Sequence, residues 1–190
     1  MWAMVKVISF EERAVASLRD RLGAAQSANE DLIAFARGHS GATAAIHSAV
    51  LSLMDASSMD AMLATVCKRW PRLLGLDHAV LALVVEGRGF RIHAKGTEEI
   101  EPRLIDRAIA GVEPVTMRGV ERGHVLFGAE AGDIHTEVVL ILTAESPLPY
   151  GLLLLGQKGT ASLDNRHGAQ LLGFLGASLV AMLRRWLMNR

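Results

Sequence analysis

A seam of mostly apolar residues with alternating three- and four-residue spacing occupies the N-terminal part of the chain. This spacing predicts an α-helix whose apolar side meets another helix, as in a coiled coil. We therefore expect residues 1–54 to form a long signalling and dimerisation helix, followed by a separate domain over residues 55–190. The seam consists of Val15, Leu18, Leu22, Ala25, Asn29, Leu32, Ala36, His39, Thr43, Ile46, Val50 and Leu53.

The seam favours a parallel homodimer, with Asn29 at one of its core positions. A buried asparagine can pair with its copy across a two-fold axis and fix the register, although a surface asparagine on a globular helix is an equally good interpretation. The apolar stripe widens in the second half of this helix, which favours a four-helix bundle with the last helix of the chain. The predicted dimer interface is Val15, Leu18, Leu22, Ala25, Asn29, Leu32, Ala36, Ile46, Leu179 and Leu183.

Between these helices the hydrophobic pattern predicts an α+β domain. One strand is a near-continuous apolar run, and the turn after it predicts an antiparallel hairpin with a half-exposed partner. We expect an antiparallel sheet of about five or six strands with helices on one face. The predicted elements are a helix from Ser57 or Ser58 to about Gly75, strands at His78–Val85 and Phe90–Ala94, a helix at Pro102–Ala110, a weak strand at Pro114–Val120, and strands at Thr136–Thr143 and Tyr150–Gln157.

Composition narrows the function further. The 190 residues are 51% hydrophobic, and 20 basic residues balance 20 acidic ones, so no basic patch for nucleic acid is indicated. One cysteine permits no internal disulfide, which together with the absence of a signal-peptide pattern favours the cytoplasm. The uncharged stretch from Gly168 to Leu183 is shorter than the roughly 20 residues of a membrane-spanning helix, so we expect a buried helix and no membrane association.

Five or so antiparallel strands with helices on one face match the layout of GAF domains. Longer segments resemble the bacterial family DUF484, a GAF-like family of unknown function, and the resemblance covers most of the chain. Its strength lies in the ordered spacing of the segments. They are "SFEERAVASLRDRL" (Ser9–Leu22), the long stretch from Asp31 to Gly87, "LFG" (Leu126–Gly128), "GLLLLG" (Gly151–Gly156) and "HGAQLLGFLGASL" (His167–Leu179).

No residue pattern supports catalysis. Cys67 follows Leu63 and Val66 on a predicted core helix, which favours a buried structural thiol over a reactive one. His135 and Glu137 have the spacing of neighbours on one strand face, but two ligands do not make a metal site, so we expect no metal and no cofactor. A small enzyme that uses His124 or His135 as a base is the remaining catalytic interpretation.

The resemblance to GAF domains implies a ligand pocket between the sheet and the segments after the second strand. The favoured interpretation of its apolar residues is that they simply fill the core, because a small core uses every large side chain. The pocket implied by the resemblance would be lined by Phe90, Ile92, Leu104, Ile105, Ile109, Leu126 and Phe127, with Arg118 or His124 as a polar anchor.

The sequence therefore favours a cytoplasmic, non-enzymatic GAF-like module that dimerises through its N- and C-terminal helices and senses a small molecule or regulates a partner. The alternative is a structural adaptor that binds another protein and whose pocket is collapsed and empty.

Overall fold

The computed structural model describes residues 10–143, 150–159 and 165–188 of the chain. The chain divides into two units, Met1–Gly41 and Ala42–Arg190. Helix α1 (Phe10–Met54) belongs to both units, and its residues from Ala42 onward pack with the domain that follows. The remaining elements are α2 (Met59–Ala64), η1 (Thr65–Arg69), α3 (Trp70–Leu74), β1 (His78–Val85), β2 (Arg88–His93), β3 (Gly96–Ile100), α4 (Pro102–Ile109), β4 (Val115–Gly119), η2 (Val125–Asp133), β5 (Thr136–Leu142), β6 (Tyr150–Gln157) and α5 (Asn165–Met188).

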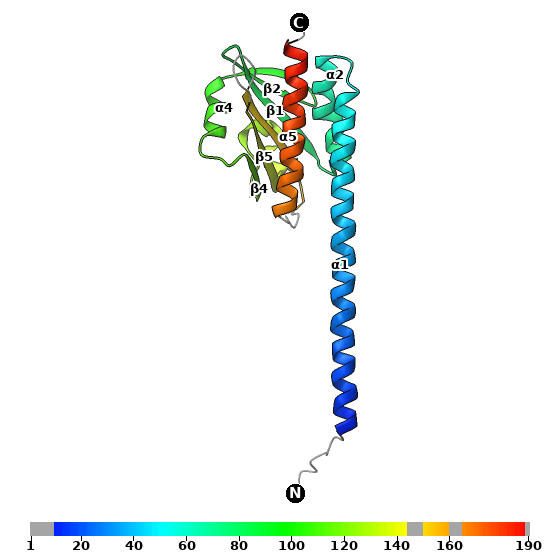
Figure 1. Cartoon of the computed structure of the whole chain (residues 1–190). Coiled ribbons are helices and arrows are strands. Elements are labelled where there is room, and N and C mark those ends of the chain that lie inside the picture. Colours follow the sequence, from blue (N-terminus) through cyan, green and yellow to red (C-terminus); the bar gives the residue numbers. More distant parts are fainter. Residues whose placement is uncertain (1–9, 144–149, 160–164, 189–190) are drawn as a thin grey trace. The chain divides into compact units, whose positions relative to one another are not determined.

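The second unit is built on one antiparallel sheet of six strands in the order β3-β2-β1-β6-β5-β4 (Figure 1). The two central strands, β1 and β6, are the apolar runs of the sequence, and both are buried along almost their whole length. A two-residue turn joins β1 to β2, with positive φ at Glu86 and Gly87, which matches the twist of an antiparallel hairpin. The predicted α+β class and antiparallel sheet are confirmed.

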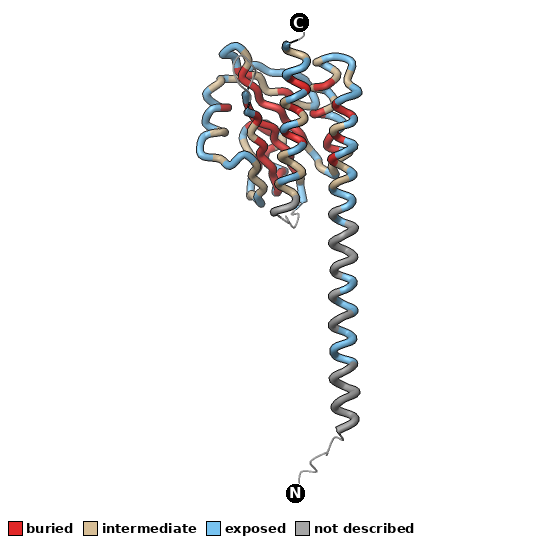
Figure 2. The backbone as a smooth tube through the Cα atoms, in the orientation of Figure 1, coloured by how far each residue is buried: buried red, intermediate tan, exposed pale blue. Residues whose placement is uncertain are grey.

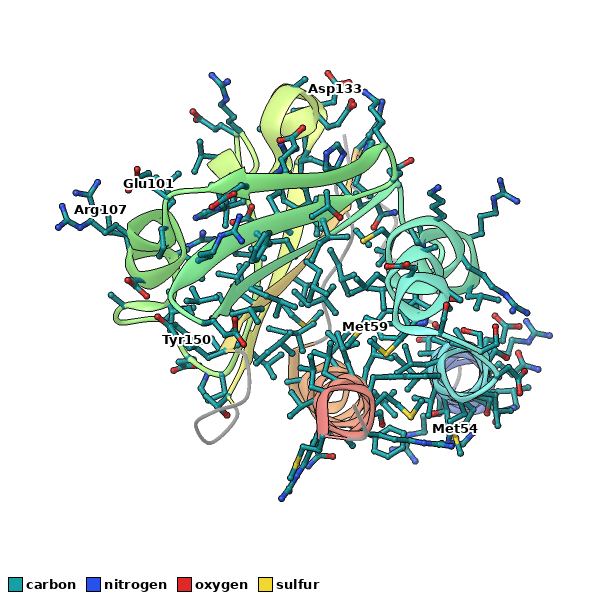
Figure 3. All side chains as sticks on the ribbon, turned by 90° about the horizontal axis from the view of Figure 1, so that it is seen from above. Met54, Met59, Glu101, Arg107, Asp133 and Tyr150 are labelled. Carbon is teal, nitrogen blue, oxygen red and sulfur yellow. The ribbon has the colours of Figure 1, made fainter. Side chains whose placement is uncertain are left out.

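The buried side chains form two clusters, one on each face of the sheet. On one face, α1, η1 and α5 cover Leu81, Leu83 and Leu140. On the other, α4 and η2 cover Val80, Ala82 and Leu152. Figure 3 shows this division, with Met54 and Met59 on one side of the sheet and Glu101, Arg107 and Asp133 on the other. The expectation that all helices cover one face is therefore wrong for α4 and η2.

Two elements have no counterpart among the predicted ones. Strand β3 is an edge strand whose residues are almost all exposed, so it lacks the apolar alternation by which strands are predicted. The 3₁₀ segment η2 contains small residues without helical periodicity, and Gly128 in its middle has a φ of +66°. Such a backbone conformation favours glycine.

Helix α5 packs one side on the sheet through Leu175, Leu179 and Leu183. Its segment Gly168–Met188 is long and apolar enough to cross a membrane, with a mean hydropathy of 1.4 over an 18-residue stretch of which only 28% is buried. This is weak evidence for a membrane span, because the core helix of a soluble protein meets the same criteria. Figure 2 shows buried positions on α5 interspersed with half-buried and exposed ones.

Candidate functional site

The residues of the predicted pocket lie on opposite faces of the sheet. Phe90 and Ile92 point toward the cluster under α1, η1 and α5, whereas Ile105, Leu126 and Phe127 belong to the cluster under α4 and η2. The reason is the alternation of β2, which places Phe90 and Ile92 on one face and Arg91 between them on the other. The prediction of one pocket lined by all of these side chains is therefore wrong.

On the α4 and η2 side, the space expected for a ligand holds core side chains. Ile105, Leu126 and Phe127 are at most 3% exposed, and Ile109 packs against the same cluster. Leu104 is 39% exposed and points away from it. Gly156 leaves the room for this packing, because a Cβ there would lie 2.6 Å from Ile134 Cδ1 and 2.9 Å from Phe127 Cζ.

The two predicted polar anchors come together around a third residue, Glu137. Arg118 and Glu137 are cross-strand neighbours on β4 and β5, and Arg118 Nε donates to Glu137 Oε1 at 2.8 Å. The backbone N–H of His124 donates to Glu137 Oε2 at 2.7 Å. Glu137 is 1% exposed, so its charge depends on these partners. The cluster joins the start of η2 to the sheet. The role of Glu137 follows from the register of β4 and β5, which the sequence alone does not specify.

The imidazole of His124 is also engaged. Its Nδ1 accepts the backbone N–H of Leu126 at 3.1 Å and so caps the first turn of η2. Burial lowers the pKa of His124, while the carboxylate of Glu137 opposes that shift and the charge of Arg118 adds to it. His135 lies outside β5 and is exposed, so it does not share a strand face with Glu137. Within the described ranges, no group of three or more histidine, cysteine, aspartate or glutamate residues could hold a metal ion.

Arg91 holds the first turn of η2 against the sheet. Its Nε donates to the carbonyl of Leu126 at 2.7 Å, and its Nη2 donates to the carbonyl of Phe127 at 3.1 Å. Its Nη1 pairs with Glu98 Oε2 at 2.7 Å, and the charge of Arg91 holds the pKa of Glu98 below its usual value. Gly128 is needed beside it, because a Cβ there would lie within 3.0 Å of the guanidinium.

A cavity of about 250 Å³ lies where β1 and β2 separate. Strand β1 pairs with β6 from His78, but its pairing with β2 starts only at Leu81↔Ile92. Cys67 lies beside this first β1–β2 pair, and its thiol donates to the carbonyl of Ile92 at 3.4 Å. The lining residues are Cys67, Asp77, His78, Ala79, Val80, Arg91, His93, Ala94, Lys95, Glu98, Phe127, Ala129 and Glu130.

The lining combines an apolar wall with polar groups. Lys95 Nζ pairs with Glu130 Oε1 at 2.9 Å, and this contact holds the pKa of Glu130 below its usual value. His93 Nε2 lies 3.1 Å from Glu98 Oε1. The Nε2 atom of His78 is buried and has no hydrogen-bond partner among the residues that the structure describes. Of the predicted pocket residues, Phe127 is part of this lining, and His78, Lys95 and Glu130 are residues that the sequence did not reveal.

The floor of the cavity belongs to η1, a π-helix. Such segments are rare and occur frequently at functional sites. Cys67 is 3% exposed, which agrees with the predicted buried thiol. Burial raises the pKa of Cys67 to about 12, while the nearby backbone of Leu81 and the charge of Lys68 act in the opposite direction. A thiol with this pKa is protonated at neutral pH and is a poor nucleophile.

Part of the predicted dimer interface lies in the core of the domain. Ile46, Leu179 and Leu183 are at most 4% exposed and pack within a single chain, so they are not available to a second copy. Leu22 is 59% exposed, and Asn29 is also exposed. The side chains of Val15, Leu18, Ala25, Leu32 and Ala36 lie outside the described part of the structure.

The arrangement of the second unit is that of a GAF-like domain. It is similar to the GAF domain of a putative sensor histidine kinase from Pseudomonas syringae pv. tomato, with a TM-score of 0.50, 15% identity, and coverage of 83% of this chain and 95% of that chain. It is also similar to free methionine-R-sulfoxide reductase from Neisseria meningitidis in complex with its substrate, with a TM-score of 0.54, 14% identity, and coverage of 76% and 89%.

A third similar structure is the chromophore-binding domain of the Stigmatella aurantiaca bacteriophytochrome, with a TM-score of 0.53, 14% identity, and coverage of 73% of this chain and 58% of that chain. The sequence model of the family DUF484, described as a protein of unknown function, matches residues 3–188. The chain therefore belongs to the DUF484 family, as the resemblance of its segments implied. No curated protein matches the sequence.

Proposed function

We propose that this chain is a non-enzymatic regulatory module that senses a small molecule. The observation that carries the proposal is the cavity between β1 and β2, which is lined by charged side chains and by His78, whose Nε2 has no hydrogen-bond partner in the described part of the chain. A buried nitrogen without a partner lowers stability, and a ligand that supplies the hydrogen bond removes that cost. The similar structures support the proposal, because one is a chromophore-binding domain and another contains a substrate.

The absence of enzymatic activity is part of the proposal. The buried Cys67 thiol stays protonated at neutral pH, and thiol chemistry requires the thiolate. The Nδ1 of His124 already accepts a backbone hydrogen bond, which restricts that imidazole as a base. Exposed His135 lies apart from the cavity lining. We further propose a cytoplasmic location without membrane association. The proposal also excludes direct nucleic-acid binding, which the equal numbers of acidic and basic residues support.

The proposal also includes a parallel homodimer, with interface positions that differ in part from those predicted from the sequence. In the second unit, an exposed row with alternating spacing runs along α5, where Phe174 is 51% exposed. A second exposed row on the last part of α1 includes Leu51 and Met54. In the first unit, exposed Leu22 supports pairing of α1 with its copy. The α5 row is Gln170, Phe174, Ala177, Ala181, Arg184 and Met188.

Native mass spectrometry of the purified chain tests both parts. A dimer that retains a discrete small mass supports the sensor and the dimer together. A monomer in this spectrum, and in light scattering at the same protein concentration, contradicts the dimer. Leu22→Glu and Phe174→Glu should each weaken association, whereas Ser27→Glu and Leu104→Glu, which alter exposed positions outside the rows, should not. Equal effects of all four changes would argue against a specific interface.

The adaptor remains the second candidate because of one observation. The space under α4 and η2, where GAF analogy predicted the pocket, is filled by Ile105, Leu126 and Phe127. With that space filled, the surfaces of the domain gain weight as the functional part, and a partner protein is the natural occupant of a surface. A dimer that carries no small mass after gentle purification, and whose melting temperature does not change with any tested metabolite, would favour the adaptor over the sensor.

A further inference from the structure

The cavity between β1 and β2 has two distinct halves. Its inner half is apolar and is formed by Cys67, Val80 and Phe127, which are at most 4% exposed. Its outer half is charged, with Lys95 on the turn between β2 and β3 and Glu130 on η2. A ligand that enters past this rim must match opposite charges at its outer end and apolar side chains at its inner end.

From this distribution we propose that the cavity binds a free α-amino acid, with its ammonium and carboxylate groups at the Lys95–Glu130 pair and its side chain against Cys67, Val80 and Phe127. The proposal rests on the proposed sensing function and specifies the class of ligand. It concerns the cavity at the separation of β1 and β2, and the filled space under α4 is not involved.

The charge balance of the rim favours a zwitterion over a singly charged molecule. Arg91 and Glu98 neutralise each other, and Arg91 also donates to the carbonyls of Leu126 and Phe127. Lys95 and Glu130 also pair with each other, at 2.9 Å, but their side chains are 76% and 35% exposed, whereas Arg91 is 14% exposed, so both charges of the Lys95–Glu130 pair are accessible to a ligand. An anion alone would pair with Lys95 and repel Glu130, and a cation alone would do the reverse. A zwitterion satisfies both charges at once.

The volume of the cavity and the buried Nε2 of His78 restrict the class of ligand further. A cavity of about 250 Å³ is smaller than the roughly 300–1,000 Å³ of sites for drug-sized molecules, which favours a ligand smaller than a nucleotide or a tetrapyrrole. The buried Nε2 of His78 can form a hydrogen bond with a carboxylate oxygen or with a polar group on the amino-acid side chain. Asp77 also lines the cavity, and its Oδ2 already accepts the backbone N–H of Lys158 at 2.8 Å.

The test uses the full-length chain and the standard L-amino acids, each added separately at millimolar concentration during thermal unfolding. At a hundredfold excess over its Kd, a binding amino acid should raise Tm by about 5–10 °C for a protein of this size. The amide and the N-acetyl derivative of the best amino acid each remove one of the two charges. Both derivatives should bind at least about tenfold more weakly.

Matched variants locate the binding. Lys95→Gln and Glu130→Gln should each weaken binding of the best amino acid at least about tenfold. Arg88→Gln and Glu99→Gln disrupt an exposed ion pair between β2 and β3 that lies outside the cavity, so they should leave binding unchanged. Equal effects of the two sets of variants would overturn the assignment to this cavity.

The outcomes also separate this inference from the proposed function. If no amino acid raises Tm, or if a singly charged derivative binds as well as the zwitterion, the amino-acid assignment is overturned. If native mass spectrometry then shows that the protein retains a small molecule of another chemical class, the sensing function stands and only the amino-acid assignment fails. If no mass is retained and no amino acid binds, both the ligand class and the sensing function fail.

Discussion

The attachment of η2 to the sheet by Arg91 gives a sharp quantitative prediction. Replacement of Arg91 by methionine keeps a long apolar stem but removes the two hydrogen bonds to the carbonyls of Leu126 and Phe127. The side chain is 14% exposed, so water has little access to replace the lost donors. A hydrogen bond that involves a charged group contributes about 1.5–3 kcal/mol when it is buried.

We take the lower value for each bond, because the change also opens a path by which water can reach the two carbonyls. The expected loss is then about 3 kcal/mol in the free energy of unfolding. The ion pair between Arg91 and Glu98 is left out of this figure, because Glu98 is exposed and such pairs contribute little.

Urea unfolding at a fixed protein concentration measures this loss. With a slope of about 2–3 kcal/mol/M, the midpoint should fall by about 1–1.5 M. Arg88→Met is the matched control, because Arg88 lies on the same strand and pairs with Glu99 on β3 but is mostly exposed. Its midpoint should stay at the wild-type value. Similar midpoints for the two variants would refute the argument that the carbonyl contacts of Arg91 hold η2 in place.

Three further predictions follow from buried groups. Gly156→Ala should destabilise the domain by about 1–3 kcal/mol in urea unfolding, because the new Cβ overlaps packed side chains, whereas Gly132→Ala, with nothing within 4 Å, should not. Glu137→Gln should cost about 2 kcal/mol, since it leaves half-exposed Arg118 without its buried counter-charge, and a neutral result would contradict that role. The pKa of Cys67 rises to about 12 on folding, so its contribution to stability is complete below pH 9 and is lost as the pH rises toward 12. Unfolding free energies across this range should therefore fall less steeply for Cys67→Ala than for the wild type, and parallel curves would refute the shift.

Local patterns predicted much of the fold, because the relevant information lay within single segments. The apolar run of β1 and the turn at Glu86 and Gly87 determine a buried strand and its hairpin partner. Pro102 at the start of α4 and Gly111 after it mark the ends of that helix. The sequence does not predict strand β3, because this strand has no apolar pattern of its own. Its glutamates pair with arginines of β2, which only the structure shows.

The site was harder to predict because it depends on which elements face each other. Alternation along β2 shows that Phe90 and Arg91 point to opposite faces, but it does not show which face α5 covers. Phe90 was therefore assigned to the pocket side. Glu137 was considered only as a partner of His135, whereas the strand register places it beside Arg118.

The cavity beside Cys67 was hard to predict for the same reason. Its position on a core helix correctly predicted a buried thiol, but helical periodicity contains no information about the end of the β1–β2 pairing beside it. The same short helical segment leads to Trp70, whose Nε1 donates to the carbonyl of Ala49 on α1 at 3.0 Å. The cavity floor and the last turns of α1 therefore belong to one packed layer.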